Sequence, residues 1–265
     1  MLDYGPEICA DLRIASQREW LVTNGLGGYA MGTISGVLTR AYHGLLIAAQ
    51  SPPENPGLPP AARTLLLAKL DETAFYDGQS YPLYANRYVA TDADEAPAIV
   101  VTPHGYRHVQ RFHLEGTTPV WTYAVADALL EKRVWMQHGA NTTYVQYRLV
   151  RATRPLTLDL CVLVTCRDHH ANVADGEGWR MTVQHLPHGL RIAAYDAYPP
   201  FYLLSDHAAA MPRHVWRPGF FLAVENYRGL LDEEAQLHAA DLHAVLQPGE
   251  TLTVVASTEP DPSLD

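Results

Sequence analysis

Apolar and polar residues alternate with a period of two along much of the chain. In Leu156–Val164 every second residue is apolar, while Thr157 and Asp159 fall between the apolar positions. Successive side chains of a β-strand point to opposite faces, so this pattern predicts a half-buried strand. Asn141–Val150 and Thr251–Ser257 alternate in the same way.

Seven more short segments have strand character, with turn residues between them. They are Trp20–Thr23, Met31–Leu38, Gly44–Ala49, Thr64–Leu70, Tyr106–His113, Val120–Ala126 and Glu131–Gln137. Helical periodicity is scarce, and the best helical candidate is the acidic stretch Asp232–Asp241. Many short strands joined by turns predict an all-β, mostly antiparallel fold of the sandwich type.

Two polar segments are expected to be surface loops, and a third is expected to be a boundary. Ser51–Pro60 contains five prolines, which cannot donate to a sheet ladder, and Thr91–Pro97 is acidic. Glu259–Asp265 is polar and follows the last predicted strand directly. We therefore expect a β-sandwich domain over residues 1–258 and a tail or domain boundary over residues 259–265.

Charge and cysteine content indicate which kinds of partner and which cell compartment to expect. The formal net charge is −10 and no cluster of Lys or Arg offsets it, which argues against nucleic acid as a partner. The chain has three cysteines, Cys9, Cys161 and Cys166, an odd number that cannot all pair in disulfides, so reduced thiols are expected. The sequence has neither a basic and apolar leader at its start nor eighteen consecutive apolar residues, so we expect no membrane contact and a cytoplasmic location.

Gly25–Ala30 matches the dinucleotide-binding pattern G-x-G-x-x-A, but its context does not fit. The segment that follows is not helical, and Gln50 stands where an acidic ribose ligand is required. A glycine-rich turn between two strands is therefore expected, and no cofactor is assigned. Residues near this turn combine aromatic faces with hydrogen-bonding groups and are candidates for sugar contact: Asn24, Tyr29, Tyr42 and His43.

A cluster of polar and titratable residues, Cys166–His170, follows the Leu156–Val164 strand. Three interpretations stay open. In the first, Cys166 and His169 are two zinc ligands, but the sequence offers no obvious second pair to complete the usual set of three or four. Arg167 and Asp168 could form an internal or inter-strand ion pair. The third interpretation is a loop at one end of the sandwich that lines a glycan or domain-interface cleft, in which case removing Arg167 or His169 would hardly change the stability of the domain.

No pair of catalytic carboxylates can be recognised from the sequence. Glycoside hydrolysis needs two carboxyl groups that flank the scissile bond. The acids nearest to apolar or aromatic residues are Asp71, Glu72, Asp168 and Glu225, and acids at strand ends are expected to be solvated. The nucleophile pattern G-x-S-x-G is absent.

Several blocks, in their order and spacing, resemble the N-terminal part of archaeal and bacterial glycogen debranching enzymes. They are REWLVTNGLGGY at 18–29, TRAYHGLL at 39–46, LLAKLDE at 66–72, KRVWMQHGANTTY at 132–144, RDHH at 167–170 and NYRGL at 226–230. The resemblance covers essentially the whole chain. His169 and His170 depart from it, because the family pattern has an aromatic–His pair there.

The resemblance implies a large super-β-sandwich, similar to mutarotase-like domains and to the N-terminal domain of glucoamylases. In that family a following (α/α) barrel carries the amylo-α-1,6-glucosidase chemistry. This chain is accordingly expected to be a non-catalytic domain that supports the barrel, in the same or a separate chain, and contacts an α-glucan such as glycogen or limit dextrin. No catalytic residue and no metal ligand is assigned.

The candidates for substrate binding or a domain interface are Asn24, Tyr29, Arg40, Tyr42, His43, Arg167, Asp168, His169 and His170. Two other functions stay open. One is a stand-alone carbohydrate-binding module. The other is an aldose epimerase-like enzyme that uses a His and a carboxylate for proton transfer.

Overall fold

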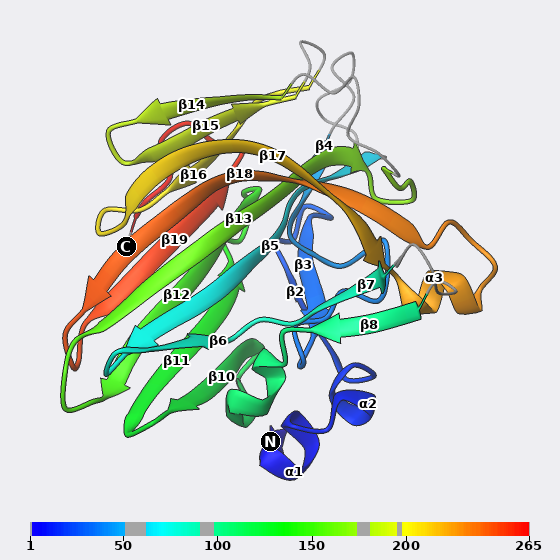
Figure 1. Cartoon of the computed structure of the whole chain (residues 1–265). Coiled ribbons are helices and arrows are strands. Elements are labelled where there is room, and N and C mark those ends of the chain that lie inside the picture. The colour runs from blue at the N-terminus through cyan, green and yellow to red at the C-terminus, as the bar shows by residue number, and fades with distance from the viewer. Residues whose placement is uncertain (1, 51–61, 91–97, 174–180, 195–197, 265) are drawn as a thin grey trace.

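Two antiparallel sheets form the molecule in a computed structural model that describes residues 2–50, 62–90, 98–173, 181–194 and 198–264 (Figure 1). In sheet order, the nine-stranded sheet A contains β1 Asp3–Tyr4, β9 Val109–Glu115, β10 Thr118–Val125, β11 Ala128–Met136, β12 Thr142–Arg151, β19 Thr251–Ser257, β16 Phe201–Leu204, β15 Gly189–Ala193 and β14 Thr182–Leu186.

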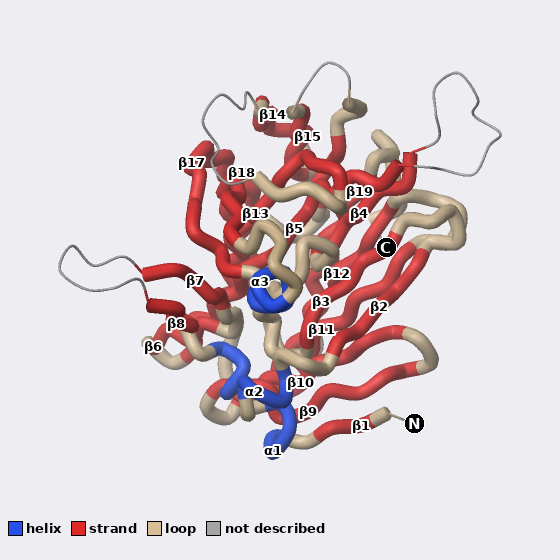
Figure 2. Tube along the Cα trace, turned by 90° about the vertical axis from the view of Figure 1, so that its right-hand side faces the viewer, coloured by secondary structure: helices blue, strands red, loops and turns tan. Residues whose placement is uncertain are grey.

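The ten-stranded sheet B contains β2 Glu19–Thr23, β3 Tyr29–Thr33, β4 Gly44–Gln50, β5 Ala62–Tyr76, β13 Leu156–Asp168, β18 Glu233–Leu246, β17 Ala209–Phe221, β7 Asn86–Ala90 and β8 Ala98–Thr102, with β6 Gln79–Pro82 paired to β5. Helices are short: α1 Pro6–Cys9, α2 Leu12–Ala15, α3 Ala223–Tyr227 and the 3-10 turn Gly105–His108. Figure 2 shows α1 and α2 at the lower end of the molecule, near β9 and β10. The all-β sandwich expected from the sequence is confirmed.

The core lies between the two sheets and is built from the alternating positions of their strands. All five apolar residues that alternate in Leu156–Val164 are fully buried in it, whereas Thr157 and Asp159 on the other face of β13 are not. Leu130 of β11 and Tyr147 of β12 belong to the same cluster. Burial of one such leucine contributes about 1.5–3 kcal/mol, so the alternation also determines which face of β13 turns inward.

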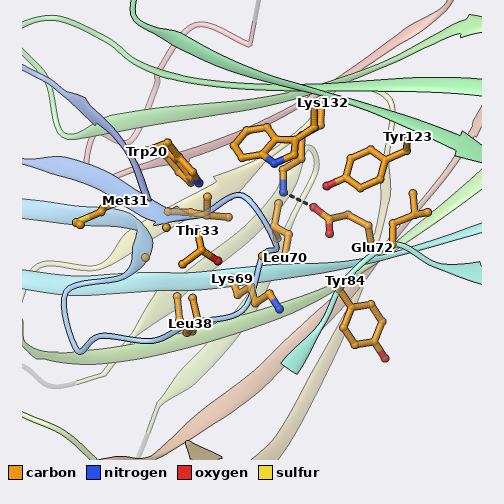
Figure 3. A pocket seen from close by; sticks show the side chains of 17 residues that line it. Trp20, Met31, Thr33, Leu38, Lys69, Leu70, Glu72, Tyr84, Tyr123 and Lys132 are labelled. Atoms are coloured by element: carbon orange, nitrogen blue, oxygen red, sulfur yellow. Dashed lines mark hydrogen bonds and ion pairs between the residues drawn. The ribbon is translucent and has the colours of Figure 1, made fainter. Parts of the chain in front are cut away.

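One ion pair lies inside this apolar layer. Lys132 of β11 reaches across to Glu72 of β5 (Figure 3). The Tyr147 hydroxyl donates to the same Glu72 oxygen at 2.9 Å. The Lys132 ammonium also lies 5.6 Å from the centre of the Trp121 ring. A cavity of only about 50 Å³ adjoins the pair, which leaves room for little more than one water molecule.

Three expected elements were wrong in type or extent. Asp232–Asp241 is not a helix: all of it except Asp232 belongs to β18, which pairs with β13 on one side and β17 on the other. The strand expected over Met31–Leu38 ends at Thr33, because the Thr33 hydroxyl donates to the Val37 carbonyl at 2.8 Å and closes a turn. The first part of Tyr106–His113 is the 3-10 turn rather than strand.

Other expectations are confirmed or fall outside the described residues. Gly25–Ala30 spans the turn between β2 and β3, and a strand rather than a helix follows it. The three cysteines are free. The expected loops Ser51–Pro60 and Thr91–Pro97 lie outside the described residues. Among the helices that the structure describes, none has the length and apolar character needed to cross a bilayer.

Candidate functional site

Asn24 holds the glycine-rich turn together from inside and does not face a ligand. Its side-chain oxygen accepts the N–H groups of Leu26 and Gly28, each at 2.9 Å, and its amide nitrogen donates to the Ala140 carbonyl at 3.0 Å. The residue is fully buried. The expectation that Asn24 contacts a sugar is therefore corrected, because its polar atoms are occupied by protein groups.

The glycines of this turn are required by its geometry. Gly25 and Gly27 have φ angles of 78° and 96°, a region that disfavours residues with a Cβ. A Cβ at Gly28 would lie 2.5 Å from the Asn24 amide nitrogen. The turn is thereby pressed against the connection between β11 and β12, which fixes the start of β3 and the position of Tyr29.

His43 and Arg40 meet at the carboxylate of Glu19. The buried His43 ring accepts the Thr39 N–H on Nδ1 at 3.1 Å, so Nε2 carries the proton and donates to Glu19 at 3.1 Å. Arg40 donates to the same Glu19 oxygen at 2.5 Å. The hydrogen bond from His43, helped by Arg40, lowers the pKa of Glu19 to about 2, whereas burial lowers the pKa of His43. His43 is thus a neutral internal group and not an open ligand.

Arg167 is an internal ion-pair residue. The β13 strand continues through Asp168, so Arg167 and Asp168 lie in a strand and not in the expected loop. Arg167 Nε donates to Glu234 of β18, and its terminal nitrogen donates to the Ala41 carbonyl at 2.8 Å. Both charged side chains are almost completely buried. Of the interpretations left open by the sequence, the inter-strand ion pair is confirmed, with Glu234 as the partner.

Two Tyr–His pairs stand at the end of β13 and form what we call the Tyr–His ridge: Tyr29, Tyr42, His169 and His170. The Tyr29 hydroxyl lies 2.9 Å from His169 Nδ1, and the Tyr42 hydroxyl lies 3.0 Å from His170 Nδ1. The two imidazole rings are 4.1 Å apart between centres. Segments far apart in sequence therefore converge, as sugar contact or a domain interface requires.

Burial affects the titration of the ridge. It raises the pKa of Tyr29 to about 12, and it lowers the pKa of His169, with a further decrease from the neighbouring His170. At neutral pH the ridge therefore presents a protonated tyrosine hydroxyl and a neutral buried imidazole. Such groups donate and accept hydrogen bonds without carrying charge.

Two depressions flank the ridge. The first depression has a volume of about 510 Å³, and its lining includes Tyr29, His169, Leu21, Met31 and Arg63. The second depression has a volume of about 260 Å³, and its lining includes Tyr42, His170, Leu230 and Leu231. Because the His169 and His170 rings touch, the ridge separates two adjoining hollows of one surface.

Arg63 was missed by the sequence analysis. It follows a proline-rich segment and belongs to no motif, yet its guanidinium donates to the Gly27 carbonyl at 2.6 Å and its own carbonyl accepts the His169 N–H at 3.1 Å. Only the pairing of β5 with β4 and β13 brings it to the ridge. No local sequence signal indicates this.

Of the four acids nearest to apolar residues, three are not solvated, contrary to expectation. Asp71, Glu72 and Glu225 are all buried, whereas Asp168 is exposed. Glu225 accepts the Ala41 N–H at 2.9 Å and pairs with Arg228. These three carboxylates are engaged by protein donors, so each has a structural role where it lies.

Two groups of side chains in the described residues could hold a metal ion. The first is Asp168, His169 and His170, and the second is Cys161, His238 and Asp241; in each group the ligand atoms lie within 4.8 Å of one another. The zinc half-set of Cys166 and His169 is not formed, since Cys166 points into the core. In the second group, Arg217 lies 3.0 Å from His238 Nδ1 and Arg213 donates to Asp241 at 2.7 Å, which opposes a cation.

A comparison with protein-family models identifies the family of this chain. No curated protein matches the chain. The family model described as glycogen debranching enzyme N terminal matches residues 18–253, a range that includes the whole ridge, all of sheet B, and sheet A except β1 and the end of β19. The chain therefore belongs to the glycogen debranching enzyme N-terminal family.

Proposed function

We propose that this chain is a non-catalytic domain of a debranching enzyme and that the Tyr–His ridge contacts the α-glucan. The observation that carries the proposal is the pairing of each ridge tyrosine with a histidine at the border of two hollows. Aromatic rings cover the C–H faces of a sugar, while hydroxyl and imidazole groups bond its hydroxyls. Few polar groups placed in a largely apolar hollow are typical of a ligand site.

The carboxylates around the ridge support binding rather than hydrolysis. None of the described residues that line the first depression is an acid. The second depression includes Glu225, whose two oxygens are taken by Ala41 and Arg228. A glycosidase needs two carboxyl groups that face the scissile bond, roughly 5–10 Å apart.

An exposed apolar area beside the second depression supports a role in holding a catalytic barrel. Tyr227 is 90% exposed, and Leu230 and Leu231 are also largely exposed. These three residues follow one another closely at the end of α3. Large apolar side chains grouped at a surface are typical of a contact with another domain.

Titration calorimetry with maltohexaose tests the glucan contact. We expect the chain to bind maltohexaose and the variants Tyr42→Ala and His170→Ala to bind it about three- to tenfold more weakly, which corresponds to the usual aromatic contribution of about 0.5–1.5 kcal/mol. Trp135→Ala is the matched control, because Trp135 stacks on Tyr144 with ring centres 5.1 Å apart on sheet A and lines neither depression. Loss of binding in the Trp135 variant, with full binding in the ridge variants, would contradict the proposal.

A further inference from the structure

A second hollow lies on the outer face of sheet B, over β5, β13, β18 and β17. These strands run side by side across the front of Figure 1. The hollow, which we call the sheet B groove, has a volume of about 520 Å³, within the range of small-molecule sites. Among the described residues, it shares no lining residue with either depression at the ridge.

Strand register builds the groove from two rows of facing residues. Cys161 of β13 is opposite Asp71 of β5 and Asp241 of β18. In the next row, Asp159 of β13 is opposite His243 of β18. Directly opposed residues on neighbouring strands place their side chains on the same face, so both rows point outward.

Charges in and directly behind the groove balance. Three carboxylates, Asp71, Asp159 and Asp241, are accompanied by three cations, Lys69, Arg213 and Arg217. Lys69 lies 2.9 Å from Asp71, and Arg213 donates to Asp241 at 2.7 Å. With no net charge, the groove favours neither an anion nor a cation over a neutral ligand.

Hydrogen-bonding capacity nevertheless remains in the groove. Arg217 bonds the His238 ring at 3.0 Å and makes no ion pair within the described part of the chain, so most of its five N–H donors are left over. Asp159 bonds His243 through one oxygen at 2.6 Å, and its side chain is 42% exposed. A guanidinium with spare donors and a carboxylate with a spare acceptor suit hydroxyl groups, which both donate and accept.

Apolar side chains complete the groove. The Phe75 ring and the Met211 side chain are both largely exposed, and both line the hollow. An exposed aromatic face beside donors and acceptors fits the alternating C–H and O–H surface of a sugar ring. A metal ion fits less well, because His238 Nδ1 faces Arg217 and its other nitrogen faces Asp241 at 2.7 Å.

We propose that the sheet B groove is a second glucan site, which binds a neutral oligosaccharide through Arg217, Asp159 and Phe75. The choice of an α-glucan as ligand rests on the function proposed for the ridge. The choice of the groove residues does not rest on that function, since the described residues that line the two sites are different. A long glucan could thereby contact the domain at two separate places.

Methionine methyl resonances distinguish the two sites. Met31 lines the first depression and Met211 lines the groove, while Met136 and Met181 are buried. In the chain labelled with ¹³C-methyl methionine and titrated with maltohexaose, we expect saturable shifts at both Met31 and Met211. Arg217→Gln should weaken the Met211 response at least about tenfold and leave the Met31 response unchanged. Arg148→Gln, an exposed arginine of sheet A, is the matched control and should change neither.

Each outcome decides between the sites. A response of Met31 alone would overturn the groove and leave the ridge standing, whereas a response of Met211 alone would support the groove and contradict the ridge. If neither the Met31 nor the Met211 methyl resonance shifts, both proposed sites are overturned. A Met211 shift with Zn²⁺ or inorganic phosphate but not with maltohexaose would also overturn the glucan assignment. If the Met136 and Met181 resonances show that Arg217→Gln is misfolded, Phe75→Ala replaces it with the same expected loss.

Discussion

Single residues differ sharply in whether they maintain the fold or face solvent, even within the RDHH motif at 167–170. Arg167 is buried against Glu234, while His170, three residues further on, is exposed; in the described part of the chain it bonds through one ring nitrogen and its backbone N–H. The early hypothesis that Arg167 is dispensable for stability is therefore replaced. His170 lies at the surface, whereas His169 is largely buried.

Removal of Arg167 is expected to be costly. Arg167→Ala leaves the Glu234 carboxylate buried without its partner, so the free energy of unfolding should fall by about 3–5 kcal/mol. His170→Ala is the control and should change it by no more than about 0.5 kcal/mol. Urea denaturation of both variants measures the difference. A loss below about 1 kcal/mol in Arg167→Ala would show that Glu234 finds another donor or becomes protonated.

Acid should remove the stabilising effect of Glu19. Its pKa is lowered to about 2 in the folded chain from an ordinary value of 4.5, so its contribution is present above about pH 4.5 and is lost as the pH falls towards 2. The difference in unfolding free energy between the wild type and Glu19→Gln should therefore shrink from pH 6 to pH 3. Urea titrations at a series of pH values measure it, and a constant difference would rule out the coupling.

Elements in this fold are determined partly by local pattern and partly by their neighbours. The alternation in β13 identifies a strand and its buried face correctly. In contrast, Asp232–Asp241 is rich in residues with high helix propensity, yet all of it except Asp232 belongs to β18, which lies between two long strands with both faces largely buried here. Tertiary pairing satisfies its backbone groups and overrides the local preference.

The two faces of β13 should respond differently to truncation. Leu160→Ala removes a fully buried side chain and should lower the free energy of unfolding by about 2–5 kcal/mol. Thr157→Ala, on the outer face of the same strand, should cost much less. Similar losses for both variants in urea denaturation would mean that the strand does not have one buried and one open face.

At the scale of the whole molecule, sheet B carries both candidate surfaces, the ridge and the groove. The described residues that line the two depressions at the ridge include one acid, Glu225, whose two oxygens are bonded by Ala41 and Arg228. We expect the chain alone to release no glucose from limit dextrin or glycogen and not to accelerate anomer exchange of glucose. When the chain is joined to a catalytic barrel, His170→Ala should lower debranching activity without lowering the melting temperature of the chain. Glucose release by the chain alone, abolished by a single carboxylate substitution in it, would overturn the non-catalytic role.

The sequence by itself determined the all-β class, most strand positions, the buried face of β13 and the turn at Gly25–Ala30. Hydrophobic alternation and backbone preference are local properties, so they can be recognised without knowledge of neighbouring strands. It also indicated Tyr29, Tyr42, His169 and His170 as candidates.

Only the tertiary structure decided which partners these residues meet. His169 lies beside Tyr29, and Arg167 beside Glu234, because β13 pairs with β5 and β18 and because β3 and β4 follow at the same end of sheet B. The same strand order brings Arg63 to the ridge and assembles the sheet B groove from four strands. Strand order depends on the packing of the whole core, and residues far apart in sequence carry no local signal of it.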